Sequence, residues 1–89
     1  MQDLVATKDE AIQTHDLYYA SYLMANGAKL EKALVTPGKG KRRIMFEFSG
    51  KNIIKLAYEY ISGEGVVNVR FLKSAMAHLR GIVFEKVNE

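Results

Sequence analysis

Two glycines and four cations lie close together in the middle of the chain and form its most distinctive group of chemically capable residues. They are Gly38, Lys39, Gly40, Lys41, Arg42 and Arg43. Glycine amides and lysine side chains together bind anions. A nucleotide-binding loop of the Gly-x-x-x-x-Gly-Lys-Ser/Thr kind does not fit this spacing, and the run joins two predicted strands. The four cations therefore predict either a contact with phosphate or nucleic acid, or a solvated turn that keeps a hairpin soluble.

The same run carries the whole positive excess of the chain. The 89 residues include 13 Lys and Arg and 10 Asp and Glu, which gives a formal net charge of +3. Without the four cations of the run, nine basic side chains would remain against ten acidic ones. Binding of nucleic acid by about four cations is weak and falls steeply with salt unless several copies act together.

Residue types that catalysis or metal binding requires are scarce. The chain has no cysteine, which excludes disulfides, thiolate zinc sites, iron-sulfur clusters and a cysteine nucleophile. His15 and Asp16 are adjacent and would point about 100° apart on a helix, and His78 is far away in the sequence. No Ser-His-Asp order, paired-carboxylate motif or Gly-x-Ser-x-Gly turn is present. We therefore predict no enzymatic activity, no metal site and no cofactor.

Five tyrosines fall in the predicted first and second helices: Tyr18, Tyr19, Tyr22, Tyr58 and Tyr60. Tyr18 and Tyr22 are four residues apart and share one side of a helix, whereas Tyr58 and Tyr60 do not. We expect these residues to bury their rings and to leave their hydroxyls in water. The alternative is that exposed rings beside the basic run stack on nucleic-acid bases.

Local signals predict three helices. The first is capped by the hydroxyl of Thr14 and ends at Gly27, because glycine adopts the left-handed conformation without steric cost. The second follows Ser49 and is closed by Gly63, and the third is capped by Asn68. The second helix has the apolar series Ile53, Leu56, Ala57, Tyr60 and Ile61. The third helix has the most regular spacing of apolar residues in the chain. Its apolar stripe is formed by Leu72, Ala75, Met76, Leu79, Ile82 and Val83.

Two apolar runs, residues 29–36 and 43–48, predict a β-hairpin. Ile44, Phe46 and Phe48 alternate with polar or smaller partners, which places three large side chains on one face of a half-buried sheet. Residues 37–41 lie between the runs and contain the turn-forming residues, so the basic run is expected at the hairpin tip.

These elements define an α+β fold in the order helix, β-hairpin, two helices, with the helices packed on one face of a small antiparallel sheet. Residues 1–10 predict a flexible tail, and residues 11–89 a single small domain. Two strands alone are marginal in water, so the sheet must lie against the helices or be extended by another copy. Met45, Ala77 and Phe84 are candidates for apolar surface left uncovered, and they favour a homo-oligomer.

Three segments together carry a resemblance to a known family. They are the run from Thr14 to Gly27, the hairpin strand Ile44-Met45-Phe46-Glu47-Phe48, and the helix opening at Phe71-Leu72. The first has the form Thr-x-Asp-Leu-x-x-Ala-x-Tyr-Leu-x-x-x-Gly. The pattern resembles an uncharacterised family of short bacterial and phage proteins, grouped as a domain of unknown function, over residues 13–84. The resemblance implies the same element order and no assigned activity.

Two functions follow as hypotheses. The first is a small non-enzymatic interaction module that self-associates or binds a protein partner. The alternative is a nucleic-acid-binding accessory protein that places Lys39, Lys41, Arg42 and Arg43 against phosphates. No apolar run approaches the roughly 18 to 20 residues needed to cross a bilayer, and residues 1–13 lack the apolar middle of a signal peptide. We therefore expect a cytoplasmic protein without membrane contact.

Overall fold

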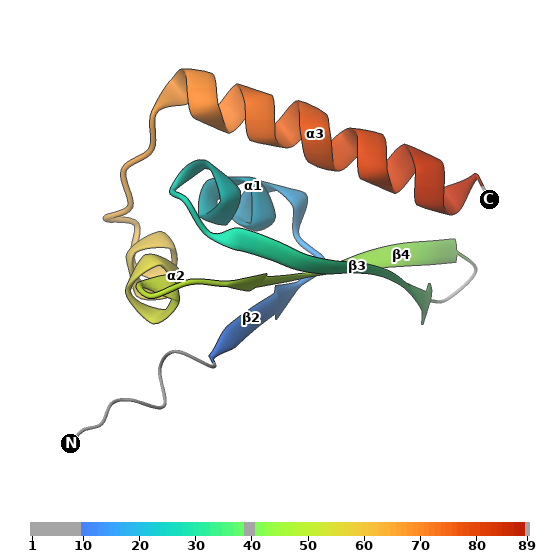
Figure 1. Ribbon diagram of the computed structural model, residues 1–89, viewed down its shortest axis with the longest axis horizontal. Coiled ribbons are helices and arrows are strands. Elements are labelled where there is room, and N and C mark those ends of the chain that lie inside the picture. The colour runs from blue at the N-terminus through green and yellow to red at the C-terminus, as the bar shows by residue number, and fades with distance from the viewer. Residues whose placement is uncertain (1–9, 39–40, 89) are drawn as a thin grey trace.

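The chain forms a three-stranded antiparallel sheet with helices on one face (Figure 1). A computed structural model describes residues 10–38 and 41–88. In chain order the elements are β2 (Ala11–Thr14), α1 (Leu17–Ala25), β3 (Lys29–Gly38), β4 (Lys41–Ser49), α2 (Ile53–Ser62) and α3 (Val69–Val87). The strand order is β2-β4-β3, so β4 is central and pairs with both neighbours. This arrangement confirms the predicted α+β class.

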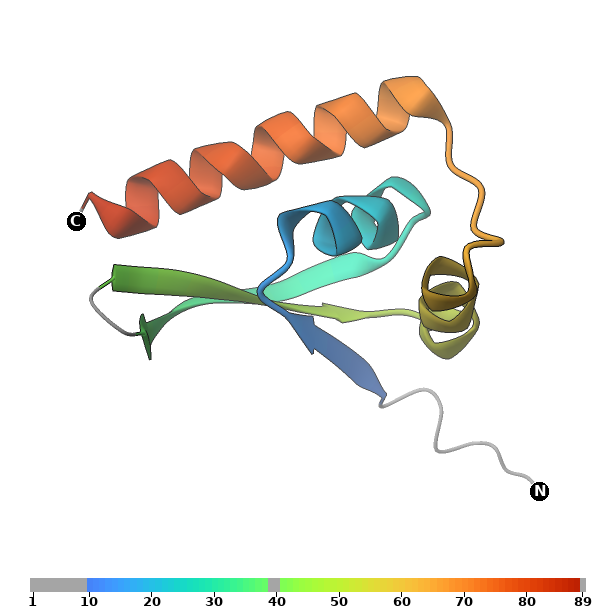
Figure 2. The same ribbon diagram turned by 180° about the vertical axis from the view of Figure 1, so that it is seen from behind.

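Helices α1 and α3 lie on the same face of the sheet, and α2 lies at the end opposite the hairpin tip (Figures 1 and 2). Helix α3 packs chiefly on α1 and reaches β4 and β3 farther along its length. No described helix covers the opposite face of the sheet, so that face stays open in both views.

Strand β2 was not predicted, and it supplies the third strand from within the chain. Its register places Ile12 opposite Phe48 and Thr14 opposite Phe46. Because side chains alternate along a strand, Ile12 joins the helix-covered face. A four-residue strand contains too few alternating residues to stand out in the sequence.

Helix α1 therefore begins two residues later than predicted. Thr14 ends β2, and its Oγ1 accepts a hydrogen bond from the Asp16 backbone N–H at 3.0 Å. Asp16 is the N-cap, and its Oδ1 accepts from the backbone N–H groups of Tyr18 at 2.8 Å and Tyr19 at 3.3 Å. The prediction of Thr14 as the N-cap was wrong, because the Asp16 carboxylate accepts the hydrogen bonds from the first free backbone N–H groups of the helix. The predicted end of the helix is confirmed at Gly27, whose φ is 97°.

The hairpin strands are longer than predicted. Strand β3 continues through Pro37 to Gly38, and Gly38 pairs with Lys41 at the start of β4. Pro37 is tolerated because β3 is an edge strand, where a missing N–H breaks no internal ladder. The predicted turn of residues 37–41 was therefore too wide.

An irregularity in β3 explains why its apolar residues do not alternate. Leu30 and Lys32 pair with the consecutive residues Phe48 and Glu47, so Glu31 is an extra residue in the strand. Its carboxylate accepts a hydrogen bond from the Ser49 hydroxyl at 2.5 Å. The bulge shifts the later residues so that both Leu30 and Ala33 face the helices.

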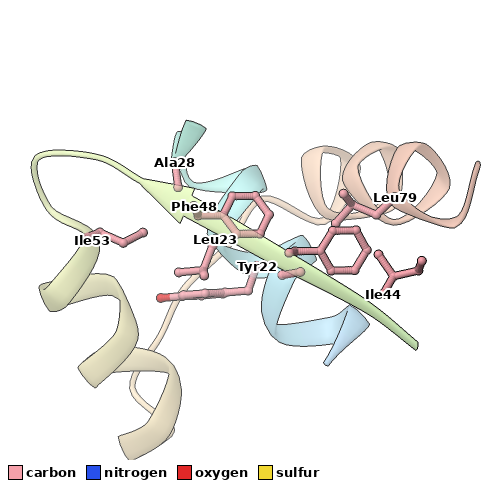
Figure 3. Close-up of a cluster of buried hydrophobic side chains, with 9 residues drawn as sticks. Tyr22, Leu23, Ala28, Ile44, Phe48, Ile53 and Leu79 are labelled. Atoms are coloured by element: carbon pink, nitrogen blue, oxygen red, sulfur yellow. The ribbon is translucent and has the colours of Figure 1, made fainter. Parts of the chain in front are cut away.

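The core lies between β4 and the helices, as predicted from the alternation of β4. The fully buried large side chains come from β4, α1, α2 and α3: Phe46, Phe48, Leu23, Ile53 and Leu79. Figure 3 shows Leu23 and Leu79 approaching the β4 side chains from different helices. Burial of each such side chain contributes about 1.5 to 3 kcal/mol to folding.

Helices α2 and α3 begin and end close to the predicted residues. Gly63 closes α2 with φ of 82°, and Asn68 Oδ1 accepts from the Phe71 backbone N–H at 3.1 Å. The predicted stripe of α3 faces inward, with Ala75 and Leu79 buried and its other members half-buried. One member of the predicted α2 series is wrong, since Ile61 is 75% exposed. Ile61 is the penultimate residue of α2, at the opposite end of the helix from the buried Ile53.

The predicted tail, residues 1–10, falls outside the described residues except for Glu10. Within the described part of the chain, no helix combines the length and apolar character that crossing a membrane requires.

Candidate interaction surfaces

The basic run at the hairpin tip does not form one described cationic surface. Lys39 and the side chain of Lys41 lie outside the described residues. Arg42 and Arg43 are exposed and consecutive in β4, so strand alternation directs them to opposite faces of the sheet. Arg42 already interacts within the chain. Arg43 is therefore the described residue of the run that is best placed to meet a phosphate.

The three predicted interface residues are divided between two sides of the molecule. Met45 pairs with Leu34 on the open face of the sheet, where Met45 is half-buried. Ala77 and Phe84 are exposed on the side of α3 away from buried Leu79, and Phe84 is 69% exposed. Because α3 covers the other face of the sheet, these residues cannot belong to one flat interface.

The histidines do not build a metal centre within the described residues. No group of three His, Asp or Glu side chains there could hold an ion. A ring nitrogen of His15, Nε2, lies 3.0 Å from the Thr36 hydroxyl and forms a hydrogen bond between the β2–α1 connection and β3. His78 is exposed on α3.

Three of the five tyrosines meet in a cluster between α1 and α2. The Tyr19 and Tyr60 rings are stacked, with centroids 4.6 Å apart and an interplanar angle of 24°. The Tyr22 ring is tilted against Tyr60 at a centroid distance of 5.2 Å. Such pairs contribute about 0.5 to 1.5 kcal/mol each beyond their buried area, so the cluster stabilises the contact between α1 and α2.

The hydroxyl of Tyr22 departs from the prediction that tyrosine hydroxyls stay in water. Tyr22 is 5% exposed, and among the described residues its Oη is a buried polar atom with no hydrogen-bond partner. Figure 3 shows this oxygen directed away from the Leu79 end of the core. It lies against Gly65 in the connection between α2 and α3.

A cavity of about 290 Å³ opens beside this cluster, and we call it the tyrosine pocket. It is bounded by α1, the end of α2, the connection to α3 and the first turn of α3. Its lining residues are Tyr18, Tyr22, Tyr60, Gly63, Gly65, Val67 and Leu72. The pocket combines residues that are 54 positions apart in the sequence, and for this reason no local sequence pattern indicates it.

The chemistry of the tyrosine pocket is apolar contact and stacking. None of its lining residues is a carboxylate, histidine, lysine or arginine. Burial raises the pKa of Tyr22 above 10.0, with a further contribution from the Glu59 carboxylate. Burial likewise raises the pKa of Tyr60, and the Asp16 carboxylate adds to it. Both hydroxyls are therefore neutral near pH 7, and the pocket holds neither an acid-base pair nor a charge for an ionic substrate.

Large apolar side chains are exposed at the same end of the molecule, on α1, α2, the connection and the start of α3. They are Tyr18, Tyr58, Ile61, Val66, Val69 and Phe71. Figure 1 places α2 and its connection to α3 far from the start of β4, so the tyrosine pocket is not beside Arg42 and Arg43. Stacking of bases on tyrosines next to the hairpin cations therefore has no geometric basis among the described residues.

Comparison with protein-family models, with curated proteins and with solved structures finds no match to this chain. The resemblance to the uncharacterised bacterial and phage family consequently stays a prediction.

Proposed function

We propose that this chain is a small non-enzymatic interaction module, and that the tyrosine pocket accepts an aromatic or aliphatic side chain from a partner protein. The observation that carries the proposal is a solvent-open apolar pocket, lined by three tyrosine rings and two aliphatic side chains, at an end of the molecule where further large apolar side chains are exposed.

The size of the pocket is sufficient for a large apolar side chain. Pockets for drug-sized ligands and cofactors measure about 300 to 1,000 Å³, and this cavity of about 290 Å³ lies just below that range. A group of this size, without charge, matches a large apolar side chain presented by another polypeptide.

The composition of the pocket also favours protein binding. Tyrosine is enriched at protein interfaces because it offers a large amphipathic contact at a low cost in conformational entropy. Stacking of Tyr60 on Tyr19 holds one wall of the pocket in place before a partner arrives. A preorganised wall lowers the free-energy cost of binding.

A pair of neighbouring substitutions tests the proposal. Val67 lines the pocket, whereas the adjacent Val66 is exposed outside it, so Val67→Trp fills the cavity and Val66→Trp is the matched control. A displayed library of random 12-residue peptides is selected against the wild-type protein. We expect the selected peptides to share an aromatic or leucine anchor, to bind the Val66→Trp protein and to lose at least tenfold in affinity for Val67→Trp. Equal binding to both variants would refute the proposal.

A second copy of the chain is one partner that the same variants test. Sedimentation at micromolar concentration measures whether the wild-type protein is a monomer or an oligomer. If the partner is a second copy, the wild-type and Val66→Trp proteins are oligomeric and the Val67→Trp protein is a monomer. A monomer in all three cases excludes a second copy as the partner.

A further inference from the structure

The outward side of α3 carries a continuous stripe that the proposed pocket does not use. Its residues are spaced by three and four positions, which places them within an arc of about 80° on a helix. They are Arg70, Lys73, Ala77, Arg80 and Phe84, and all five are exposed. The stripe lies opposite the buried residues Ala75 and Leu79, which face α1 and the sheet.

The charge of this stripe is not neutralised within the described part of the chain. Between Val69 and Phe84 the sequence has three cations, one histidine and no carboxylate. Among the residues that the structure describes, Arg70, Lys73 and Arg80 form no ion pair. Three like charges along one side of a helix favour an anionic partner.

A second copy of the stripe would be a poor partner. In an antiparallel pair of such helices centred between Met76 and Ala77, Lys73 would lie opposite Arg80. In a parallel pair each cation would lie opposite its own copy. Like charges placed directly opposite each other are unfavourable, so both arrangements are disfavoured. The predicted self-association through Ala77 and Phe84 is therefore less favourable than contact with a polyanion.

The shape of α3 matches a groove of double-stranded DNA. The helix has 19 residues and is therefore about 28 Å long. It lies along the outer margin of the molecule, with no described element on its far side in either view (Figures 1 and 2). Ser74, Ala77 and Gly81 beside the cations are small, so the helix backbone can approach a groove closely. The major groove of B-DNA admits an α-helix, whereas the deep, narrow major groove of duplex RNA does not.

We propose that α3 docks in the major groove of double-stranded DNA, with Arg70, Lys73 and Arg80 contacting phosphates. This site lies on a different surface from the tyrosine pocket and does not depend on it. It also differs from the hairpin tip, where the described cations point to opposite faces of the sheet.

Fluorescence anisotropy with a fluorescein-labelled random-sequence 20-base-pair DNA tests the proposal on the full chain. The test variant replaces all three cations of the stripe: Arg70→Gln, Lys73→Gln and Arg80→Gln. The matched control replaces three exposed cations outside α3, namely Lys29→Gln, Lys32→Gln and Lys55→Gln, and so changes the net charge equally. Circular dichroism checks that each protein is folded.

Three phosphate contacts predict that wild-type affinity falls about 40-fold between about 50 and 200 mM salt. The test variant is expected to lose at least about tenfold in affinity at the lower salt, and its salt slope should decrease by about three. The control variant should stay within about twofold of the wild-type protein. Should the triple test variant fail to fold, the single changes Arg70→Gln and Arg80→Gln are each expected to lower the slope by about one.

Several outcomes would overturn the proposal. One is the absence of DNA binding by the wild-type protein at about 50 mM salt, and another is an equal loss in the control and test variants. Equal affinity for DNA and for duplex RNA of the same length would contradict docking in the major groove. Binding to phosphatidylserine vesicles without binding to DNA would assign the stripe to a membrane surface. Unchanged DNA binding by the Val67→Trp protein is expected, because the two surfaces are separate.

Discussion

The hydroxyl oxygen of Tyr22 lies directly against the backbone of Gly65. A Cβ atom at position 65 would be 2.5 Å from Tyr22 Oη and 2.8 Å from Cζ, which is closer than such atoms approach in folded proteins. Tyr22 is buried and packed on Tyr60, so the ring cannot move aside freely. Glycine at position 65 is therefore required by the position of a tyrosine 43 residues earlier in the chain.

Replacement of Gly65 by alanine should lower the free energy of unfolding by about 1 to 3 kcal/mol, the usual cost of overpacking. Urea denaturation measures this value. Gly81→Ala is the control, because nothing lies within 4 Å of its added Cβ; in a helix it should instead stabilise the protein by about 0.5 to 1 kcal/mol.

Tyr22→Phe should leave stability unchanged or raise it, because the change removes a buried hydroxyl that has no described partner. In the double variant with Gly65→Ala, the loss should be smaller than that of Gly65→Ala alone, since the nearest overlapping atom is gone while the ring carbon Cζ remains. Additive effects in this double-mutant cycle would contradict the contact between the two positions.

Stability should fall at alkaline pH because of the tyrosine cluster. Burial raises the pKa of Tyr19, Tyr22 and Tyr60 above the 10.0 of an unfolded tyrosine. Above pH 10 the unfolded chain therefore releases protons that the folded chain retains, so the free energy of unfolding decreases as pH rises from 10 through the folded-state pKa. Urea denaturation, repeated at intervals of about one pH unit between about pH 9 and 12, measures the free energy of unfolding. This free energy should decrease less steeply with pH for Tyr60→Phe than for the wild-type protein. Parallel curves would contradict this account.

The N-cap of α1 should contribute measurably to stability. Asp16→Ala removes the acceptor for two backbone N–H groups and should cost about 1 kcal/mol, with a lower thermal midpoint by calorimetry. Asp16→Asn keeps an acceptor oxygen and should retain most of the stability. A loss as large for Asn as for Ala would point to the charge of Asp16 rather than to its capping hydrogen bonds.

Two large residues on α3 should respond in opposite ways to truncation. Leu79 is fully buried in the core, so Leu79→Ala should cost about 2 to 5 kcal/mol. Phe84 is exposed, so Phe84→Ala should change the stability of the monomer by less than about 0.5 kcal/mol. A large effect of Phe84→Ala that depends on protein concentration would instead indicate an oligomer through this residue.

Local signals in the sequence predicted most of the secondary structure. The alternation of Ile44, Phe46 and Phe48 identified the buried face of β4, and the ends of the helices followed from Gly27 and Gly63. These predictions hold because periodicity and end signals act between residues that are near each other in the chain. Strand β2 was missed because it is short and gains its stability from pairing with β4, more than 30 residues away.

The candidate sites likewise differ in whether local residue spacing is enough to predict them. The positive charge of α3 and the apolar stripe opposite it can be read from residue spacing alone, because a helix places residues three and four apart on one side. The tyrosine pocket cannot, because Tyr22, Tyr60 and Leu72 come from three helices whose contact depends on how the core packs. Likewise, the hairpin cations were visible as a cluster in the sequence, but strand alternation in the folded sheet separates Arg42 from Arg43. Short-range order is encoded locally, whereas a binding surface requires long-range packing to bring its parts together.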